Sequence, residues 1–392
     1  MLLTRLRFSS YKKFSGKEEM EIRPITVLVG KNSSGKSSIT KLFPFLKRAL
    51  SGAAINGPLS YNNDDVMLGG GYVDLSHNGY LTDLGLGVTF DNKLSIDMEI
   101  FSQDGSDALA STYTLTLNND IYVLKMKSDA DNYSCEILNK DYPVSGLSGF
   151  IHKELFNDIP LTDSLTQNID YIGPLRVTPK PIFVHDSSAV INHVGKEGEN
   201  AYSMLFRSEE LANKVSGWFM EAFKGVTFEV DKLPQPNNFR ILFHKPYSKE
   251  YGINICNEGM GIGQVLPIVV RCFYPVKDSI VVVEQPELHL HPAAHDALAK
   301  LFAQTAIDNN QRYIIETHSK NILLGIREAV VDEQCPLKPE DVIVYFVDED
   351  ESGAYLRAIT IDSSGVLSDW PTGVWEESTE QLRKIRNLRK AF

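Results

Sequence analysis

Residues 30–37, which read GKNSSGKS, restrict the fold of this chain more than any other stretch. They match the phosphate-loop pattern GxxxxGKS/T at four positions, namely Gly30, Gly35, Lys36 and Ser37. The pattern is meaningful between a strand and a helix, and residues 25–29 (ITVLV) predict a short buried strand before it. Residues 37–50 predict a helix after it, which Pro44 kinks or divides.

The residue types of this loop suit the binding of a nucleoside triphosphate. Glycines let successive backbone N–H groups turn toward phosphate oxygens, and the following helix adds the positive end of its dipole. Lys36 is expected to reach the β- and γ-phosphates, and the Ser37 hydroxyl to take a place on Mg²⁺. The same loop adds further predicted ATP-binding residues: Asn32, Ser33, Ser34 and Ser38. The alternative is a glycine- and serine-rich turn without a ligand.

Composition and charge are those of a globular protein and disfavour several classes. The 392 residues are 43% hydrophobic and 23% charged, and a net charge of −12 argues against a broadly basic nucleic-acid-binding surface. No apolar run reaches the roughly 18 residues that suggest a membrane span, and residues 1–14 carry no secretory signal. The four cysteines lack metal-ligand spacing, so we expect free thiols in a reducing cytoplasm.

The pattern of elements predicts an α/β nucleotide-binding domain in two parts, residues 1–55 and 251–392, split by an insertion at 56–250. Short β-type runs in the insertion predict an antiparallel meander, at residues 87–90, 94–101, 111–117, 121–126 and 133–138. Helices are predicted there at 150–167 and 195–223, and strands at 171–176, 226–230 and 239–243. From residue 251 the α/β alternation returns, with strands at 279–283, 313–316, 342–347 and 354–361 and helices at 265–273, 293–307 and 320–327.

The second half of the candidate site begins at residues 279–287, which read SIVVVEQPE. A buried strand followed by an acid is the Walker B arrangement, so Glu284 is expected to reach the metal opposite Ser37. His318 follows the next strand, at the edge where parallel sheets bind ligands, and is expected to contact a γ-phosphate or the attacking water. The alternatives are a strand that ends in an exposed acid and a histidine with a structural role.

A second glycine-rich stretch, residues 257–267 (NEGMGIGQVLP), opens a helix and predicts another phosphate-facing N-terminus. One phosphate loop already serves one nucleotide. We therefore expect Gly261, Gly263 and Gln264 to touch the ATP of a partner subunit. Residues 11–14 (YKKF) either place an aromatic or basic side chain against an adenine ring or form an exposed turn.

The order of these motifs (phosphate loop, GMGIGQ, EQPELHLHP, ETHS) resembles the ABC-type ATPases of the OLD-like group, AAA-type ATPases related to SMC and DNA-repair ATPases. Residues 171–176 (YIGPLR) and 369–373 (DWPTG) are similar to a subgroup common in prokaryotic anti-phage defence. The resemblance implies an ABC-type domain that forms a homodimer or higher homo-oligomer. Two ATPs with Mg²⁺ would each lie between one subunit's phosphate loop and the other's second glycine loop. It also implies a D-loop at 288–292, which accounts for His289 and His291 without zinc.

One departure from the family concerns hydrolysis. Family members commonly read DEPE where this chain reads EQPE, so Gln285 replaces the usual catalytic glutamate. Glutamine cannot accept a proton as a general base, although it can orient water, and Glu287 is the nearest alternative carboxylate. We therefore predict slow ATP hydrolysis by four residues, Glu284, Gln285, Glu287 and His318.

A second departure concerns the effector. OLD nucleases carry a Toprim domain after the ATPase, but only about 70 residues follow His318, and the acidic residues 348–351 predict a hairpin turn. We expect a separate effector protein, such as a nuclease, with nucleic acid or a phage protein as the trigger. Residues 381–392 predict either a docking helix or a solvated one. The alternative functions are a DNA-handling, SMC-like ATPase and a nucleotide-gated scaffold without significant hydrolysis.

Overall fold

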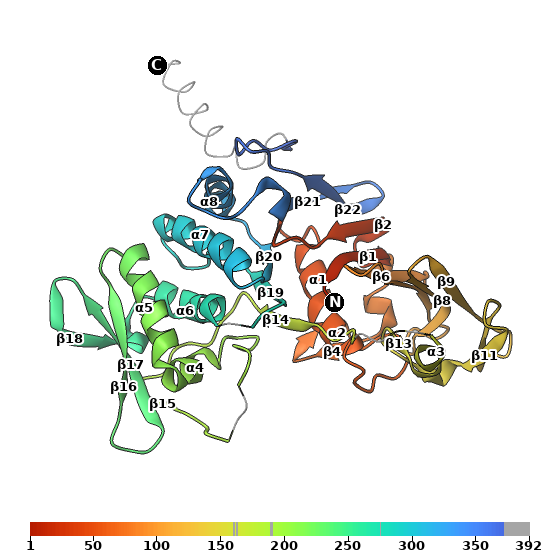
Figure 1. Cartoon of the computed structure of the whole chain (residues 1–392), viewed down its shortest axis with the longest axis horizontal. Helices are drawn as coiled ribbons and strands as arrows, with labels where there is room; N and C mark the ends of the chain where they lie inside the picture. Colours follow the sequence, from red (N-terminus) through yellow and green to blue (C-terminus); the bar gives the residue numbers. More distant parts are fainter. Residues whose placement is uncertain (160, 162–163, 189–190, 275, 372–392) are drawn as a thin grey trace, which may run out of the picture.

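The computed structural model describes residues 1–371 except 160, 162–163, 189–190 and 275. The predicted C-terminal helix at 381–392 lies outside the described residues. One large sheet runs through the molecule (Figure 1). Its strands in chain order are β1 (Leu3–Tyr11), β2 (Phe14–Glu21), β3 (Ile25–Gly30), β6 (Leu84–Phe90), β7 (Ser95–Phe101), β8 (Leu109–Leu117), β9 (Asp120–Met126), β10 (Asn132–Cys135), β11 (Lys140–Pro143), β14 (Asn168–Ile172), β19 (Ser279–Glu284), β20 (Arg312–Glu316), β21 (Val342–Asp350) and β22 (Gly353–Ile359).

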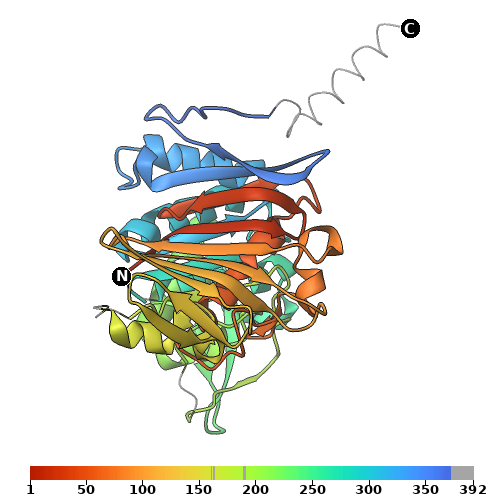
Figure 2. The same ribbon diagram turned by 90° about the vertical axis from the view of Figure 1, so that its right-hand side faces the viewer.

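The spatial order of these strands differs from their order in the chain. They lie in the order β11-β10-β9-β8-β7-β6-β1-β2-β22-β21-β3-β20-β19-β14. The neighbours from β21 to β14 pair in parallel, so their carboxyl ends meet along one edge of the sheet. The other neighbours pair antiparallel, except β2 and β22, which pair in parallel. Figure 2 shows β1, β2 and the meander side by side, so the meander extends the sheet.

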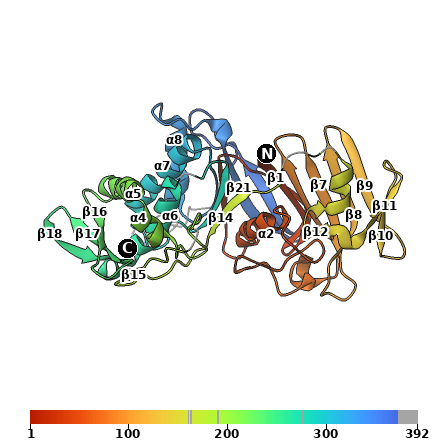
Figure 3. The same cartoon turned by 60° about the horizontal axis from the view of Figure 1, so that its bottom comes forward.

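Helices cover both faces of the parallel strands because alternate strand residues point to opposite sides. In β19, Ile280 and Val282 belong to one hydrophobic core, whereas Val281 and Val283 belong to the other. The first face carries α1 (Lys36–Thr40) and α2 (Leu42–Ala49). The opposite face carries α6 (Met260–Phe273), α7 (Pro292–Asp308) and α8 (Lys320–Val331), as Figure 3 shows.

A smaller unit lies beyond α6, at the left of Figure 1. It contains the helices α4 (Ala201–Arg207) and α5 (Glu209–Ala222) and the strands β15 (Phe183–Val184), β16 (Thr227–Lys232), β17 (Asn238–Lys245) and β18 (Ser248–Asn254). Phe219, Phe228 and Phe243 pack ring against ring between α5 and this sheet. The remaining short elements are β4 (Asn62–Asn63), β5 (Val66–Met67), β12 (Leu147–Ser148), β13 (Ile151–His152), α3 (Lys153–Asp158) and the 3₁₀ turns η1 (Tyr72–Asp74), η2 (His77–Gly79), η3 (Val144–Gly146), η4 (Ile255–Asn257) and η5 (Pro339–Asp341).

The predicted α/β class is confirmed, and so is the hairpin at 348–351, where Asp350 pairs with Gly353. Three helix predictions need correction. The helix at 150–167 is wrong beyond the short α3. The helix at 195–223 begins only at Ala201 and divides at Ser208, whose hydroxyl caps α5. The helix after the phosphate loop divides at Lys41 instead of Pro44, because proline fits the first turn of α2, where its missing N–H has no helical partner.

Several strands were not predicted from the sequence, among them β2, β11 and β18. Across the described residues, none of the helices is both long enough and apolar enough to cross a membrane.

Candidate nucleotide-binding site

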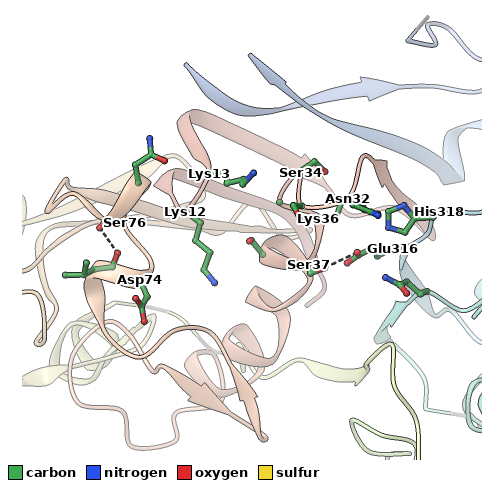
Figure 4. A pocket seen from close by; sticks show the side chains of 17 residues that line it. Lys12, Lys13, Asn32, Ser34, Lys36, Ser37, Asp74, Ser76, Glu316 and His318 are labelled. Atoms are coloured by element: carbon green, nitrogen blue, oxygen red, sulfur yellow. Dashed lines mark hydrogen bonds between the residues drawn. The ribbon is translucent and has the colours of Figure 1, made fainter. Parts of the chain in front are cut away.

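A pocket of about 750 Å³ lies at the carboxyl edge of the parallel strands (Figure 4). The phosphate loop forms one wall, through residues 32–38. Gln285, Glu316 and His318 come to the pocket from the ends of β19 and β20. Lys12, Lys13 and parts of the segment 73–79 form the opposite side. Segments from both ends of the chain therefore meet around one cavity.

The phosphate loop has the backbone that its glycines predict. Gly35 adopts φ 112°, and a Cβ at this position would lie 2.9 Å from the ring of Phe14. Lys36 is only 3% exposed and donates to the carbonyl oxygens of Gly30 (3.0 Å) and Lys31 (2.7 Å). Burial lowers the pKa of Lys36. The ammonium group is thus held inside the loop, at the place where phosphate oxygens are expected.

Of residues 11–14, only the two lysines face the pocket. Tyr11 and Phe14 are buried in the core, and the Tyr11 hydroxyl donates to the Ser38 carbonyl at 2.9 Å. An aromatic contact with adenine from these two residues is therefore excluded. Lys12 and Lys13 retain the role that the sequence left open for a basic side chain.

Glu284 does not lie against Ser37 as expected. Its carboxyl group is 3% exposed and accepts hydrogen bonds from the hydroxyls of Tyr171 (2.8 Å) and Thr40. The Ser37 hydroxyl instead donates to Glu316 Oε1 at 3.0 Å (Figure 4). Glu284 is also not among the described residues that line the pocket.

Glu316 is a site residue that the sequence analysis missed. It ends β20, the strand between β3 and β19, and pairs in register with Glu284. It is 2% exposed, and its Oε2 atom has no hydrogen-bond partner among the described residues. Burial and the nearby Glu284 raise the pKa of Glu316 to about 7. The signal was available: an acid precedes His318 by two residues, at the end of a strand next to β3.

Gln285 has a constrained backbone. Its φ is 45°, and its N–H donates to the carbonyl oxygen of Glu316 at 2.7 Å. The Arg176 guanidinium donates to the carbonyl oxygens of Glu284 (2.5 Å) and Gln285 (3.3 Å). Burial lowers the pKa of Arg176 to about 10, so the group keeps its charge at neutral pH. Arg176 therefore holds the turn that presents Gln285.

Gln264 is turned inward. Its amide accepts from the Arg176 N–H at 3.2 Å and donates to the Arg176 carbonyl at 3.1 Å. It is 6% exposed, so its expected contact with a partner's ATP would require a rearrangement. Gly261 packs against the backbone of His289, while the neighbouring Met260 is 64% exposed. The start of α6 therefore presents Met260 to solvent and connects Gln264 to the end of β19 through Arg176.

Two protein families match parts of the chain. Residues 189–323 match the family described as AAA ATPase domain, and residues 337–385 match a protein family of unknown function (DUF3696). The first of these matches covers about a third of the chain. No curated protein matches the sequence.

The fold of this chain is similar to that of SMC heads. One similar structure is an Smc head bound to the C-winged helix domain of ScpA, with 13% identity and a TM-score of 0.51 over 92% of this chain and 98% of that chain. A second is the Smc head with an extended coiled coil, bound to the C-terminal domain of ScpA derived from Pyrococcus furiosus. It has 12% identity and a TM-score of 0.50 over 98% of this chain and 99% of that chain. At these identities the likeness concerns the fold.

The two remaining predicted catalytic residues, Glu287 and His318, contact each other. Glu287 Oε1 accepts a hydrogen bond from the backbone N–H of His318 at 2.8 Å. His318 lines the pocket, whereas Glu287 does not. Partial loss of water around the imidazole and the nearby Lys36 lower the pKa of His318. A neutral imidazole at neutral pH suits a hydrogen bond to phosphate or water.

A magnesium ion carried by ATP fits the donor atoms beside the phosphate loop. Among the described residues, no group of three His, Cys, Asp or Glu side chains could hold a metal on its own. Mg²⁺ in nucleotide sites takes one or two protein ligands together with phosphates and water. The Ser37 hydroxyl and the unpartnered oxygen of Glu316 are hard oxygen donors on the pocket wall. Bound Mg²⁺ would neutralise phosphate charge there.

Tyr171→Phe is expected to lower the free energy of unfolding by about 2 kcal/mol, because it removes a buried hydrogen bond to the Glu284 carboxyl group. The matched control is Tyr202→Phe, since the Tyr202 hydroxyl is buried without a partner among the described atoms. Urea unfolding of both variants measures the difference. Equal effects of the two substitutions would show that the Tyr171–Glu284 bond adds nothing to stability.

Proposed function

We propose that this chain is an ABC-type ATPase that dimerises around ATP·Mg²⁺, hydrolyses it slowly, and in its ATP-bound form controls a separate effector protein in prokaryotic anti-phage defence. One observation carries the dimer. The pocket and the second glycine loop lie apart, and none of residues 259–264 lines the described pocket. With Met260 exposed beside that loop, the nucleotide of one copy meets the loop of another copy. ATP then joins the subunits by mass action. A higher homo-oligomer would form if the same contact is repeated between further copies.

Slow hydrolysis is supported by how the acids are engaged. Gln285 lines the pocket in place of a general base, and it can orient a water molecule without accepting its proton. Glu284 is held by two hydroxyl groups, and Glu287 is bonded to the His318 backbone. The same arrangement favours the second candidate, a nucleotide-gated scaffold with negligible hydrolysis.

Control of a partner is supported by the two SMC heads, each of which was solved with a domain of the separate protein ScpA. For this chain we propose only that it controls a separate effector protein, with nucleic acid or a phage protein as the trigger. The DNA-handling, SMC-like alternative is consistent with the SMC-head fold, but α7, at 17 residues the longest helix in the described part of the chain, is too short for a coiled-coil arm. We also retain the three-part division at 1–55, 56–250 and 251–392 and a cytoplasmic location as proposals; the free cysteines suit the latter.

The test is the mass of the full chain by light scattering, without nucleotide and with ATP·Mg²⁺. We expect a shift from 43.9 kDa to twice that mass or more when ATP is added. Met260→Asp is expected to weaken this assembly at least tenfold, because its carboxylate would face the partner's phosphates. An acid in the first turn of α6 favours the helix, so the loss would not come from unfolding.

Met260→Gln is the matched control, since it is polar but uncharged, and we expect it to assemble like the wild type. A mass that is the same with and without ATP would overturn the ATP-dependent dimer. ATPase rates measured with DNA, and with the products of neighbouring genes, then separate the three functions. Stimulation by DNA alone would favour the DNA-handling ATPase, whereas no turnover under any condition would favour the scaffold.

A further inference from the structure

Three carboxyl groups lie near the phosphate loop, and only one of them has an atom free for a ligand on the pocket wall. Glu284 accepts from two buried hydroxyls, both through Oε1, and does not line the pocket. Glu287 accepts from the backbone N–H of His318 through Oε1, and its Oε2 atom also has no partner among the described atoms, but Glu287 does not line the pocket either. Glu316 lines the pocket beside Ser37 and keeps Oε2 without a partner among the described atoms.

The burial of Glu316 makes this unpartnered oxygen informative. Its side chain is 98% removed from solvent, since only 2% is exposed. A buried carboxyl oxygen without a donor or a cation is unfavourable and is uncommon in native proteins. The Ser37 hydroxyl, the phosphate-loop position that takes a place on Mg²⁺, contacts the other oxygen of the same group at 3.0 Å. Figure 4 shows both side chains on the same wall as Lys36.

We propose that Glu316, together with Ser37, holds the divalent cation of bound ATP, and that Glu284 is a positioning residue. The proposal rests on the proposed function, because it concerns the metal of the same nucleotide site. Glu284 does not line the pocket, and its Oε1 atom accepts from the hydroxyls of Tyr171 and Thr40, which are 8% and 0% exposed. Glu316 has to release only the Ser37 hydroxyl, which becomes its fellow ligand. Glu284 instead joins β14, α1 and β19 beneath the loop.

The experiment measures binding of fluorescent N-methylanthraniloyl-ATP to the full chain in EDTA and in Mg²⁺. The quantity compared is the dissociation constant in EDTA divided by the dissociation constant in Mg²⁺. A large ratio means that the bound metal contributes strongly to nucleotide affinity. In Glu316→Gln we expect this ratio to fall at least tenfold, because a metal ligand is lost. Affinity in EDTA is expected to stay equal or to rise, since a carboxylate near the phosphates is removed. Glu284→Gln removes the same charge from a residue that does not line the pocket, and it is expected to change the ratio less than Glu316→Gln does.

Three further variants keep the test from depending on whether Glu316→Gln folds. Ser37→Ala is expected to lower the ratio, whereas Ser37→Thr retains the hydroxyl and is expected to preserve it. Glu316→Asp keeps a shorter carboxylate and is expected to fall between the wild type and Glu316→Gln. A lowered ratio in Glu284→Gln with an unchanged one in Glu316→Gln would overturn the metal assignment and leave the proposed function intact. A wild type that binds no ATP in either buffer would refute both.

Discussion

Lys36→Ala is expected to weaken ATP binding by more than 100-fold. The ammonium group is buried in the phosphate loop, where it now satisfies the carbonyls of Gly30 and Lys31, and a bound phosphate would take its place opposite this charge. Removing one member of a buried, hydrogen-bonded charge pair costs about 2–5 kcal/mol, and 3 kcal/mol corresponds to roughly a 100-fold loss. Isothermal titration with ATP·Mg²⁺ measures the dissociation constant directly.

The same variant should fold normally. Without nucleotide, Lys36→Ala loses two hydrogen bonds to carbonyls at a pocket wall, so the free energy of unfolding should fall by only about 1–3 kcal/mol. The thermal stabilisation that ATP gives the wild type should disappear. Lys31→Ala is the matched control, because Lys31 is exposed and the loop uses only its carbonyl oxygen. Equal ATP affinity in Lys36→Ala and Lys31→Ala would refute the assignment of this pocket.

The fold was predictable where local pattern decides it. Continuous apolar runs identified β3, β19 and β20, because a parallel strand that is buried on both faces needs apolar residues at nearly every position. Alternation identified the meander, but not that it pairs with β1 and so continues the main sheet. That pairing joins segments about 80 residues apart, and no local period encodes it. The helix predicted at 150–167 ends at Asp158, because the next residue, Ile159, precedes a proline in the sequence and is extended.

The motifs of the site could be predicted from the sequence, but the contacts between its side chains could not. The phosphate loop, Gln285 and His318 lie around one pocket because each follows a strand of the same parallel group. Which acid faces Ser37 depends on the strand order, and β20 lies between β3 and β19. Glu316 therefore reaches Ser37, while Glu284 is one strand further away. Arg176 was invisible for a similar reason, since its contacts are two carbonyls distant in sequence.

Asp170→Ala is expected to lower the free energy of unfolding by about 3–5 kcal/mol, because it leaves a buried guanidinium unpaired. Arg271 lies on α6 and Asp170 on β14, with Nε 2.5 Å from Oδ2 and side chains that are 1% and 7% exposed. Arg271 also donates to the Ser279 hydroxyl at 2.9 Å. Denaturant unfolding of the full chain measures the loss. Since stabilities of whole domains are about 5–15 kcal/mol, this single change should be severe.

The exposed ion pair of Arg240 and Asp231 isolates the effect of burial. Its N–O distance is 2.6 Å, close to that of the buried pair, but its side chains are 44% and 31% exposed, so Asp231→Ala should cost less than about 1 kcal/mol. Adding Arg271→Met to Asp170→Ala should recover most of the loss, because an apolar side chain removes the unpaired charge. If the double variant is no more stable than Asp170→Ala, the loss comes from packing at β14 and not from the charge. Recovery would show that the Arg271–Asp170 pair holds α6, which carries the second glycine loop, to the sheet, and that removing only the aspartate is destabilising because it leaves the buried guanidinium unpaired.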